Sequence, residues 1–254
     1  MRVRLFVPCY VEHLKPAAGL AAARVLDSLG LDWTCPDGQG CCGQPAFNAG
    51  HPDEALPAAR RFRRLFDAAE AVVAPSASCV AMVRRYHHLG GLAASEREAL
   101  ADLGARTFEL CEFLVDRLGV TDLGARWPGR VAFQDCCHAL RELGLFDAPR
   151  RLLAAVDGLE VVDQPDLDCC GFGGVYAVKL PEVSAAQADL RLDALAAAGT
   201  DTLVATDVSC LLHLEGRARR RGLPFRGLHV AEILAPDPAA ARPAPGAQTS
   251  EATP

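Results

Sequence analysis

The chain has no long hydrophobic run and no excess of basic residues. No stretch reaches the roughly 18 uninterrupted apolar residues of a membrane-spanning helix, so we expect no membrane span. The formal net charge of -6 argues against nucleic acid as a partner. Residues 1–7 lead directly into Pro8 and Cys9, without the apolar segment and cleavage site of a secretory signal. These absences predict a cytoplasmic protein.

Cysteine, in contrast, is abundant, with 11 among 254 residues. Disulfides are rare in a reducing compartment, so such thiols serve metal, cluster or redox chemistry, or pack as small buried side chains. One pattern, a lone cysteine followed by a cysteine pair and a glycine, occurs twice, 128 positions apart. Its members are Cys9, Cys41, Cys42 and Gly43 in the first half and Cys137, Cys169, Cys170 and Gly171 in the second.

The repeat extends beyond these motifs. Residues 71–79 parallel residues 202–210, and each segment is expected to be a buried strand that ends in a cysteine, Cys79 or Cys210. A repeat of this length indicates a duplicated structural unit. The expected domains are a first repeat over residues 1–125, a second over 126–235, and a disordered tail rich in Pro and Ala over 236–254.

Strands and helices are expected to alternate within each half. Short β-rich runs at residues 2–7 and 130–134 predict the first strand of each repeat. Apolar spacing of three and four predicts helices over residues 15–29, 53–69, 148–156 and 182–198. The predicted fold class is therefore α/β, with two pseudo-symmetric repeats, each a small parallel sheet flanked by helices. Ligands of such sheets bind beyond the carboxyl ends of the strands, where we expect the cysteines.

Each half offers four cysteines in the same order, as a cluster bound by four thiolates needs. Neighbouring side chains of a strand point to opposite faces, so a cysteine pair can serve one cluster only from an irregular loop. Gly43 and Gly171 supply that backbone freedom and a close approach to the cofactor. The predicted iron-sulfur ligands are Cys9, Cys41, Cys42 and Cys79 in one set and Cys137, Cys169, Cys170 and Cys210 in the other.

Zinc and unmetallated thiols are the alternatives. Structural zinc usually draws on Cys-x-x-Cys spacing and histidine, which neither half shows. Cys35 and Cys111 have no counterpart in the other half, so we expect both to be structural. Cys136 adjoins Cys137, but the matching position in the first half is Pro8, so we expect Cys136 to stand outside the ligand set.

Three further residues are weaker candidates for catalysis. His138 and Arg141 lie within a helical turn of Cys137, where they could tune a cluster or hold a carboxylate- or quinone-like acceptor. A helix-start histidine and a solvated arginine are the alternative interpretation. Lys179, just before a predicted helix, is a similar candidate. Flanking polar residues are expected to be turn or capping residues: Ser76, Ser78, Asp207 and Ser209.

Residues 41–48 and 169–174 resemble the cysteine-rich Cys-Cys-Gly domain family. That family includes the B subunit of heterodisulfide reductase, the iron-sulfur subunit of glycolate oxidase, and lactate utilization protein A. Four more segments resemble the lactate utilization members in order and spacing, so these are the closest. The segments are residues 7–10, 75–79, 137–144 and 178–182, and the resemblance covers residues 1 to about 235.

The resemblance implies an iron-sulfur electron-transfer subunit of an oxidoreductase system that oxidises L-lactate to pyruvate. Its expected partners are a ferredoxin-like iron-sulfur subunit and a third subunit, without which it is inactive. Heterodisulfide reductase subunits carry Cys-x-x-Cys where Ser76 and Asp207 stand here, so four-cysteine [4Fe-4S] clusters, up to two, are expected in place of five-cysteine ones.

Several alternatives to lactate oxidation stay open. They are a subunit of a complex oxidising glycolate or glycerol 3-phosphate, a thiol-disulfide enzyme like heterodisulfide reductase, and a redox sensor. A dinucleotide site is not among them, because the glycine-rich residues 171–174 follow a cysteine pair and do not open a helix after a strand.

Overall fold

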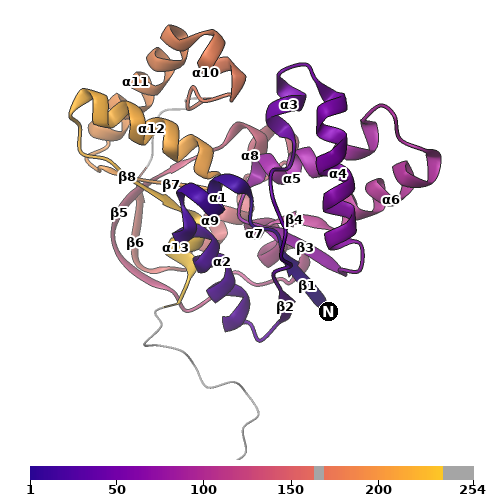
Figure 1. Ribbon diagram of the computed structural model, residues 1–254. Helices are drawn as coiled ribbons and strands as arrows, with labels where there is room; N and C mark the ends of the chain where they lie inside the picture. The colour runs from indigo at the N-terminus through magenta and orange to yellow at the C-terminus, as the bar shows by residue number, and fades with distance from the viewer. Residues whose placement is uncertain (163–168, 237–254) are drawn as a thin grey trace, which may run out of the picture.

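The computed structural model describes residues 1–162 and 169–236 (Figure 1). Two α/β halves lie side by side, the first coloured indigo to magenta and the second pink to yellow. Apart from Pro236, the tail expected to be disordered lies outside the described residues. Within residues 1–162 and 169–236, no helix combines the length and apolar character that crossing a bilayer demands.

The elements follow the same order in both halves, except that the first half adds η1, α6 and η2. The first half contains β1 (Arg2–Leu5), α1 (Cys9–Leu14), α2 (Pro16–Ser28), β2 (Asp32–Thr34), α3 (Gln44–Asn48), α4 (Pro52–Phe66), β3 (Ala71–Ala74), α5 (Ala77–Arg84), η1 (Tyr86–His88), α6 (Ala94–Ala105), β4 (Thr107–Glu109), α7 (Leu110–Glu112) and η2 (Phe113–Arg117). The second contains β5 (Arg126–Gln134), α8 (Cys137–Glu142), α9 (Asp147–Ala154), β6 (Asp157–Val162), α10 (Val175–Lys179), α11 (Pro181–Ala197), β7 (Thr202–Ala205), α12 (Val208–Arg221), β8 (Arg226–His229) and α13 (Val230–Leu234).

Each half builds one parallel four-stranded sheet, so the predicted fold class is confirmed. The strand orders are β2-β1-β3-β4 and β6-β5-β7-β8, which are the same order in repeat-equivalent strands. From β1 the chain moves to β2 on one side and then returns to β3 on the other. The carboxyl ends of β1 and β3, and of β5 and β7, therefore flank a topological switch point, where open α/β sheets bind their ligands.

Central strands and amphipathic helices account for this architecture. All four residues of β3 and of β7 are buried, as expected for strands covered by helices on both faces of a sheet. Helix α4 begins with Pro52 in its first turn, and its buried residues recur at helical spacing. These buried residues are Ala55, Ala59, Phe62 and Phe66. The helices predicted around residues 15–29, 53–69, 148–156 and 182–198 all form, as α2, α4, α9 and α11.

One local prediction is wrong. The strands expected to end in cysteines stop earlier, at Ala74 and Ala205, and Cys79 and Cys210 lie in the first turns of α5 and α12. The reason is capping, because Ser76 and Asp207 accept hydrogen bonds from backbone amides of the first helical turn. The cysteines are consequently held by helix N-termini.

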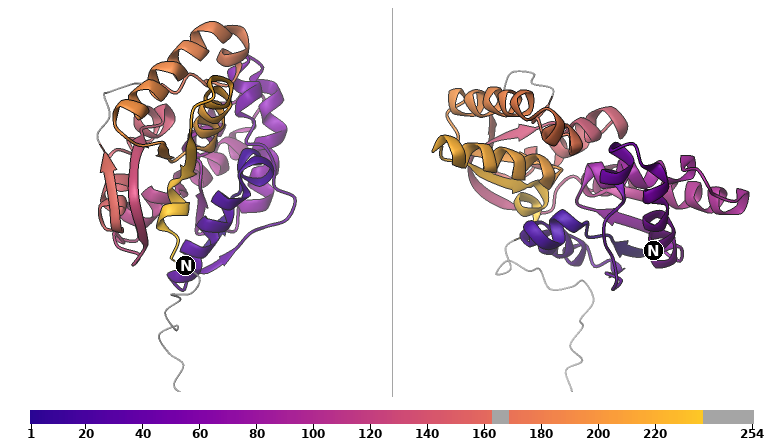
Figure 2. Two further views of the ribbon diagram at one scale, coloured as in Figure 1. Left: turned by 90° about the vertical axis from the view of Figure 1, so that its left-hand side faces the viewer. Right: turned by 45° about the horizontal axis from the view of Figure 1, so that its top comes forward.

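The two halves share one hydrophobic core. A single cluster of buried side chains includes Val3 and Val25 from the first half and Val131 and Ile233 from the second. Helix α2 packs against α13, and the two run next to each other in Figures 1 and 2. Strand β5 starts the second sheet at residue 126, but the domain boundaries stay a prediction, since the core crosses them.

A buried carboxylate also joins the halves. Asp207 is 2% exposed, and its Oδ2 accepts hydrogen bonds from the Ser78 amide at 2.8 Å and from the Ser76 hydroxyl at 3.2 Å. Its Oδ1 accepts from the Ser209 amide at 3.1 Å. Ser76 and Asp207 occupy equivalent positions of the two repeats and are hydrogen-bonded to each other. Asp207 thus caps its own helix and a helix of the other repeat.

We expect Asp207→Asn to destabilise the protein by about 1–3 kcal/mol, because the buried amide donors lose a charged acceptor. Denaturant unfolding under anaerobic conditions measures this change. The matched control is Asp193→Asn, which removes an exposed partner of Arg221 and should change stability by no more than about 0.5 kcal/mol. Equal effects of the two substitutions would contradict the role given to Asp207.

Candidate metal centre

The cysteines gather at the switch point of each sheet. Cys9 opens α1 directly after β1, and Cys79 lies in α5 after β3. The pair Cys41 and Cys42 lies in an irregular loop between β2 and α3, as the sequence predicted. The second half repeats this arrangement: Cys137 opens α8, Cys210 lies in α12, and Cys169 and Cys170 lie in a loop before α10.

The two switch points face each other across one cavity of about 380 Å³. Nine of the 11 cysteines line it: Cys9, Cys41, Cys42, Cys79, Cys136, Cys137, Cys169, Cys170 and Cys210. All eight predicted ligands are among them. Sequence reasoning assigned one set to each half, and the structure adds that both sets open into the same cavity.

The four thiols of the first set form a hydrogen-bonded chain. Cys42 and Cys9 donate to the sulfur of Cys41, which lowers the pKa of Cys41 and raises the pKa of both donors. Cys42 is also within hydrogen-bonding contact of Cys79. The Gly43 amide lies 3.3 Å from the Cys41 sulfur and favours its thiolate further. Cys41 is therefore the thiol of this set whose thiolate form is most favoured.

The second set repeats the chain and lengthens it. Cys137 and Cys170 donate to Cys169, whose pKa is lowered, and the Gly171 amide lies 3.3 Å from the Cys169 sulfur. Cys170 and Cys210 are in contact as Cys42 and Cys79 are in the first set, but here the contact lowers the pKa of the pair's cysteine and raises that of Cys210.

The lengthening comes from Cys136. The Cys210 thiol is also in hydrogen-bonding contact with the Cys136 sulfur, and this contact is the main cause of the raised pKa of Cys210. Cys136 thus lies among the thiols of the cavity. The sequence had placed it outside the ligand set, because the equivalent position of the first half is Pro8. Its position beside Cys137 was the sequence signal that could have identified it.

The two glycines have a backbone role. Gly43 and Gly171 adopt φ of +84° and +90°, which side chains disfavour, so the predicted freedom at both positions is confirmed. A Cβ at Gly171 would lie 2.4 Å from the Ser184 carbonyl oxygen, and one at Gly43 would lie 3.1 Å from the Ala55 Cβ. Both loops are thereby held tightly against α11 and α4. Direct contact of these glycines with a cofactor stays a prediction.

An arginine accompanies each set on equivalent helices. Arg61 on α4 donates to the Cys41 carbonyl oxygen at 3.1 Å, and its charge lowers the pKa of the Cys41 thiol. Arg191 on α11 is 4% exposed. Burial lowers the pKa of Arg191, while the neighbouring thiols of Cys170 and Cys136 favour its charged form. Sequence analysis identified neither arginine, because their relation to the cysteines depends on tertiary packing.

The three weaker candidates separate in the structure. His138 lines the cavity; its Nε2 lies 3.2 Å from Gln44 Nε2 of the first half, and its Nδ1 lies 3.7 Å from the Cys137 sulfur. Arg141 is exposed, although its charge contributes to the lowered pKa of Cys169. Lys179 is exposed at the end of α10 and does not line the cavity. Only His138 can therefore touch a bound group there.

The two remaining cysteines lie away from the cavity. Cys111 is fully buried in the shared core and hydrogen-bonded to Glu109, which fits the structural role predicted for it. Cys35 is exposed, and its sulfur accepts a hydrogen bond from Gln39 Nε2 at 3.2 Å. Neither Cys35 nor Cys111 lines the cavity that the nine other cysteines line.

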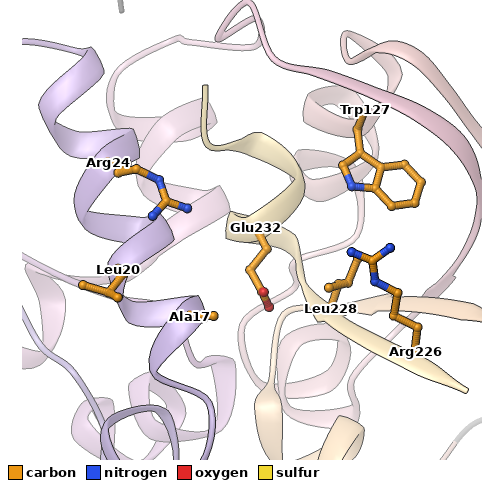
Figure 3. Close-up of a pocket in the computed structure, with 7 residues that line it drawn as sticks. All are labelled: Ala17, Leu20, Arg24, Trp127, Arg226, Leu228 and Glu232. Carbon is orange, nitrogen blue, oxygen red and sulfur yellow. The ribbon is translucent and has the colours of Figure 1, made fainter. Parts of the chain in front are cut away.

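A second hollow of about 250 Å³ lies between α2, β8 and α13 and contains no thiol (Figure 3). It is lined by Ala17, Leu20, Arg24, Trp127, Arg226, Leu228 and Glu232. Over residues 1–162 and 169–236, no three His, Cys, Asp or Glu side chains are grouped so as to hold a single metal ion. The cavity with nine cysteines is the candidate site, because thiols are the donors that iron binds in clusters.

Comparison with known proteins supports the duplicated motif. The family model described as "Cysteine-rich domain" (CCG) matches residues 3–84 and 131–215, which cover both repeats. Lactate utilization protein A of Macrococcus caseolyticus (strain JCSC5402) is 41% identical over 235 residues, 92% of this chain and 96% of that protein. Lactate utilization protein A of Geobacillus kaustophilus (strain HTA426) is 43% identical over 236 residues, 92% and 98% of the two chains. The matched repeats and these identities confirm the resemblance, and the chain belongs to the cysteine-rich Cys-Cys-Gly domain family.

Proposed function

We propose that this protein holds two iron-sulfur clusters and transfers electrons as a subunit of a system that oxidises L-lactate to pyruvate. One observation carries the proposal: two repeat-equivalent sets of four thiols line a single cavity, whose lining also includes Cys136, His138 and Asp207. The proposed ligands are Cys9, Cys41, Cys42 and Cys79 for one cluster and Cys137, Cys169, Cys170 and Cys210 for the other.

The donor set fits a cluster in its chemistry. Iron in clusters takes soft thiolate ligands, commonly four, and each set supplies four. A cluster spreads its irons over several positions, so its thiolates need not converge on the one point that a single zinc ion requires. The amides of Gly43 and Gly171 already point at Cys41 and Cys169 sulfur, as donors that tune a cluster do.

The residues around the cavity support electron transfer. A bound cluster supplies one-electron chemistry. The rings of Tyr10 and Phe172, from different halves, pack edge to face with centroids 6.1 Å apart in the lining of the cavity. Gln44 and His138, also from different halves, line the same cavity, with their Nε2 atoms 3.2 Å apart. Since both thiol sets share this cavity, an electron exchanged between them stays inside the protein.

The lactate assignment rests on the relatives that carry the name lactate utilization protein A. Lactate oxidation releases two electrons, whereas clusters exchange electrons singly. We therefore propose cytoplasmic partners, a ferredoxin-like iron-sulfur subunit and a third subunit, that complete the reaction. Positions 76 and 207 do not supply a fifth thiolate, because they hold Ser76 and Asp207, which are hydrogen-bonded to each other.

Cys42→Ser and Cys170→Ser should each remove about half of the bound iron, since each damages one four-thiolate set. Iron and sulfide analysis with electron paramagnetic resonance, on protein purified anaerobically, measures the loss. Full iron retention in both variants would exclude the two-set assignment.

Cys35→Ser and Cys111→Ser test the limits of the set. Neither thiol lines the cavity, so iron and sulfide content should stay at the level of the unsubstituted protein in both variants. Cys111→Ser keeps a hydrogen-bond donor beside the buried Glu109 and should leave the cluster spectrum unchanged. Iron loss as large as in Cys42→Ser would show that the ligand set has been misassigned.

Deletion of the gene should abolish growth on L-lactate and spare growth on pyruvate, because the step that is lost is the one that forms pyruvate. The unsubstituted gene should restore growth, whereas Cys42→Ser and Cys170→Ser should not. Cys35→Ser is the matched cysteine control and should restore it. Normal growth on lactate with a defect on glycolate or glycerol 3-phosphate would keep the cluster assignment and replace the substrate.

A further inference from the structure

The ninth cysteine of the cavity makes the two thiol sets unequal. Cys136 is 2% exposed and forms the N-cap of α8, immediately before Cys137. Its sulfur is in hydrogen-bonding contact with the Cys210 thiol and lies 3.8 Å from the Gln134 carbonyl oxygen, so Cys136 adjoins the end of the chain Cys137, Cys169, Cys170 and Cys210. Cys136 therefore lies within reach of anything bound by Cys210.

The equivalent position in the first half has the same geometry without a sulfur. Pro8 is the N-cap of α1 with φ -67° and ψ 158°, and Cys136 is the N-cap of α8 with φ -72° and ψ 134°. Both residues line the cavity. The backbone thus offers this position to both sites, and only the second site fills it with a thiol.

The arginines beside the two sites also differ, in how deeply they are buried. Arg191 is almost fully buried, and its neighbours include the thiols of Cys136, Cys170 and Cys210. Arg61, its counterpart on α4, is half-buried and donates to a backbone carbonyl. A buried cation stabilises additional negative charge in its surroundings. The second site is accordingly built to accommodate one more thiolate than the first.

We propose that Cys136 is a fifth thiolate ligand of the second iron-sulfur site, so that the two sites of this protein hold clusters of different ligation and potential. This inference rests on the proposed clusters. An added thiolate makes a site more negative and stabilises its oxidised form, and net charge is one of the factors that set cluster potential. The duplicated fold then provides two unlike electron carriers within one cavity.

The test uses the full chain with one site inactivated. In the Cys42→Ser background, which retains the second site, Cys136→Ser should change the Mössbauer and electron paramagnetic resonance spectra and raise the midpoint potential. Cys111→Ser in the same background is the matched control and should leave spectra and potential unchanged. An unchanged spectrum and potential in Cys136→Ser would overturn the inference and leave the proposed function intact.

A gain-of-ligand variant tests the same inference without removing a native thiol. In the Cys170→Ser background, which retains the first site, Pro8→Cys should shift the spectrum toward that of the native second site and lower the midpoint potential. If Cys136→Ser does not fold, an unchanged first-site spectrum in folded Pro8→Cys overturns the inference. Absence of iron and sulfide from the unsubstituted protein would instead refute the proposed function, and this inference with it.

Discussion

The order of strands in each parallel sheet is the constraint on which the site depends. Because β1 and β3 are adjacent while the chain between them visits β2 on the far side, the segments that leave β1 and β3 diverge at one edge. Cys9 and Cys79 stand at the starts of those segments. The loop after β2 brings the cysteine pair to the same edge, so residues far apart in sequence become neighbours without any long excursion of the chain.

Joining the two edges into one cavity depends on the contact between the repeats. Asp207 accepts hydrogen bonds from amides at the starts of two helices, one in each half, where a carboxylate is also favoured by the helix dipoles. The shared core, with α2 against α13, fixes the same relation from the other side of the sheets. A single repeat would leave its thiols on an open edge, whereas the pair surrounds them with protein.

Duplication has kept the framework and altered the chemistry. The thiol chains, the glycine amides and the helical arginines recur in both halves. Cys136 and the deeper burial of Arg191 do not. Pseudo-symmetry in the backbone therefore coexists with unequal surroundings, because a backbone position such as an N-cap can hold proline or cysteine with little change in conformation.

The sequence by itself determined the duplication, the α/β class, and the grouping of eight cysteines into two sets, because a repeated spacing is visible without coordinates. It also located the helices whose apolar spacing is regular. Tertiary structure alone decided that both sets face one cavity, that Cys136 lines it too, and that Lys179 does not. The strands were predicted to run on to Cys79 and Cys210, because hydrophobicity does not reveal where a capping side chain starts a helix. Contacts between the repeats involve residues of low sequence signal, such as Arg191, whose surroundings exist only after the chain has folded.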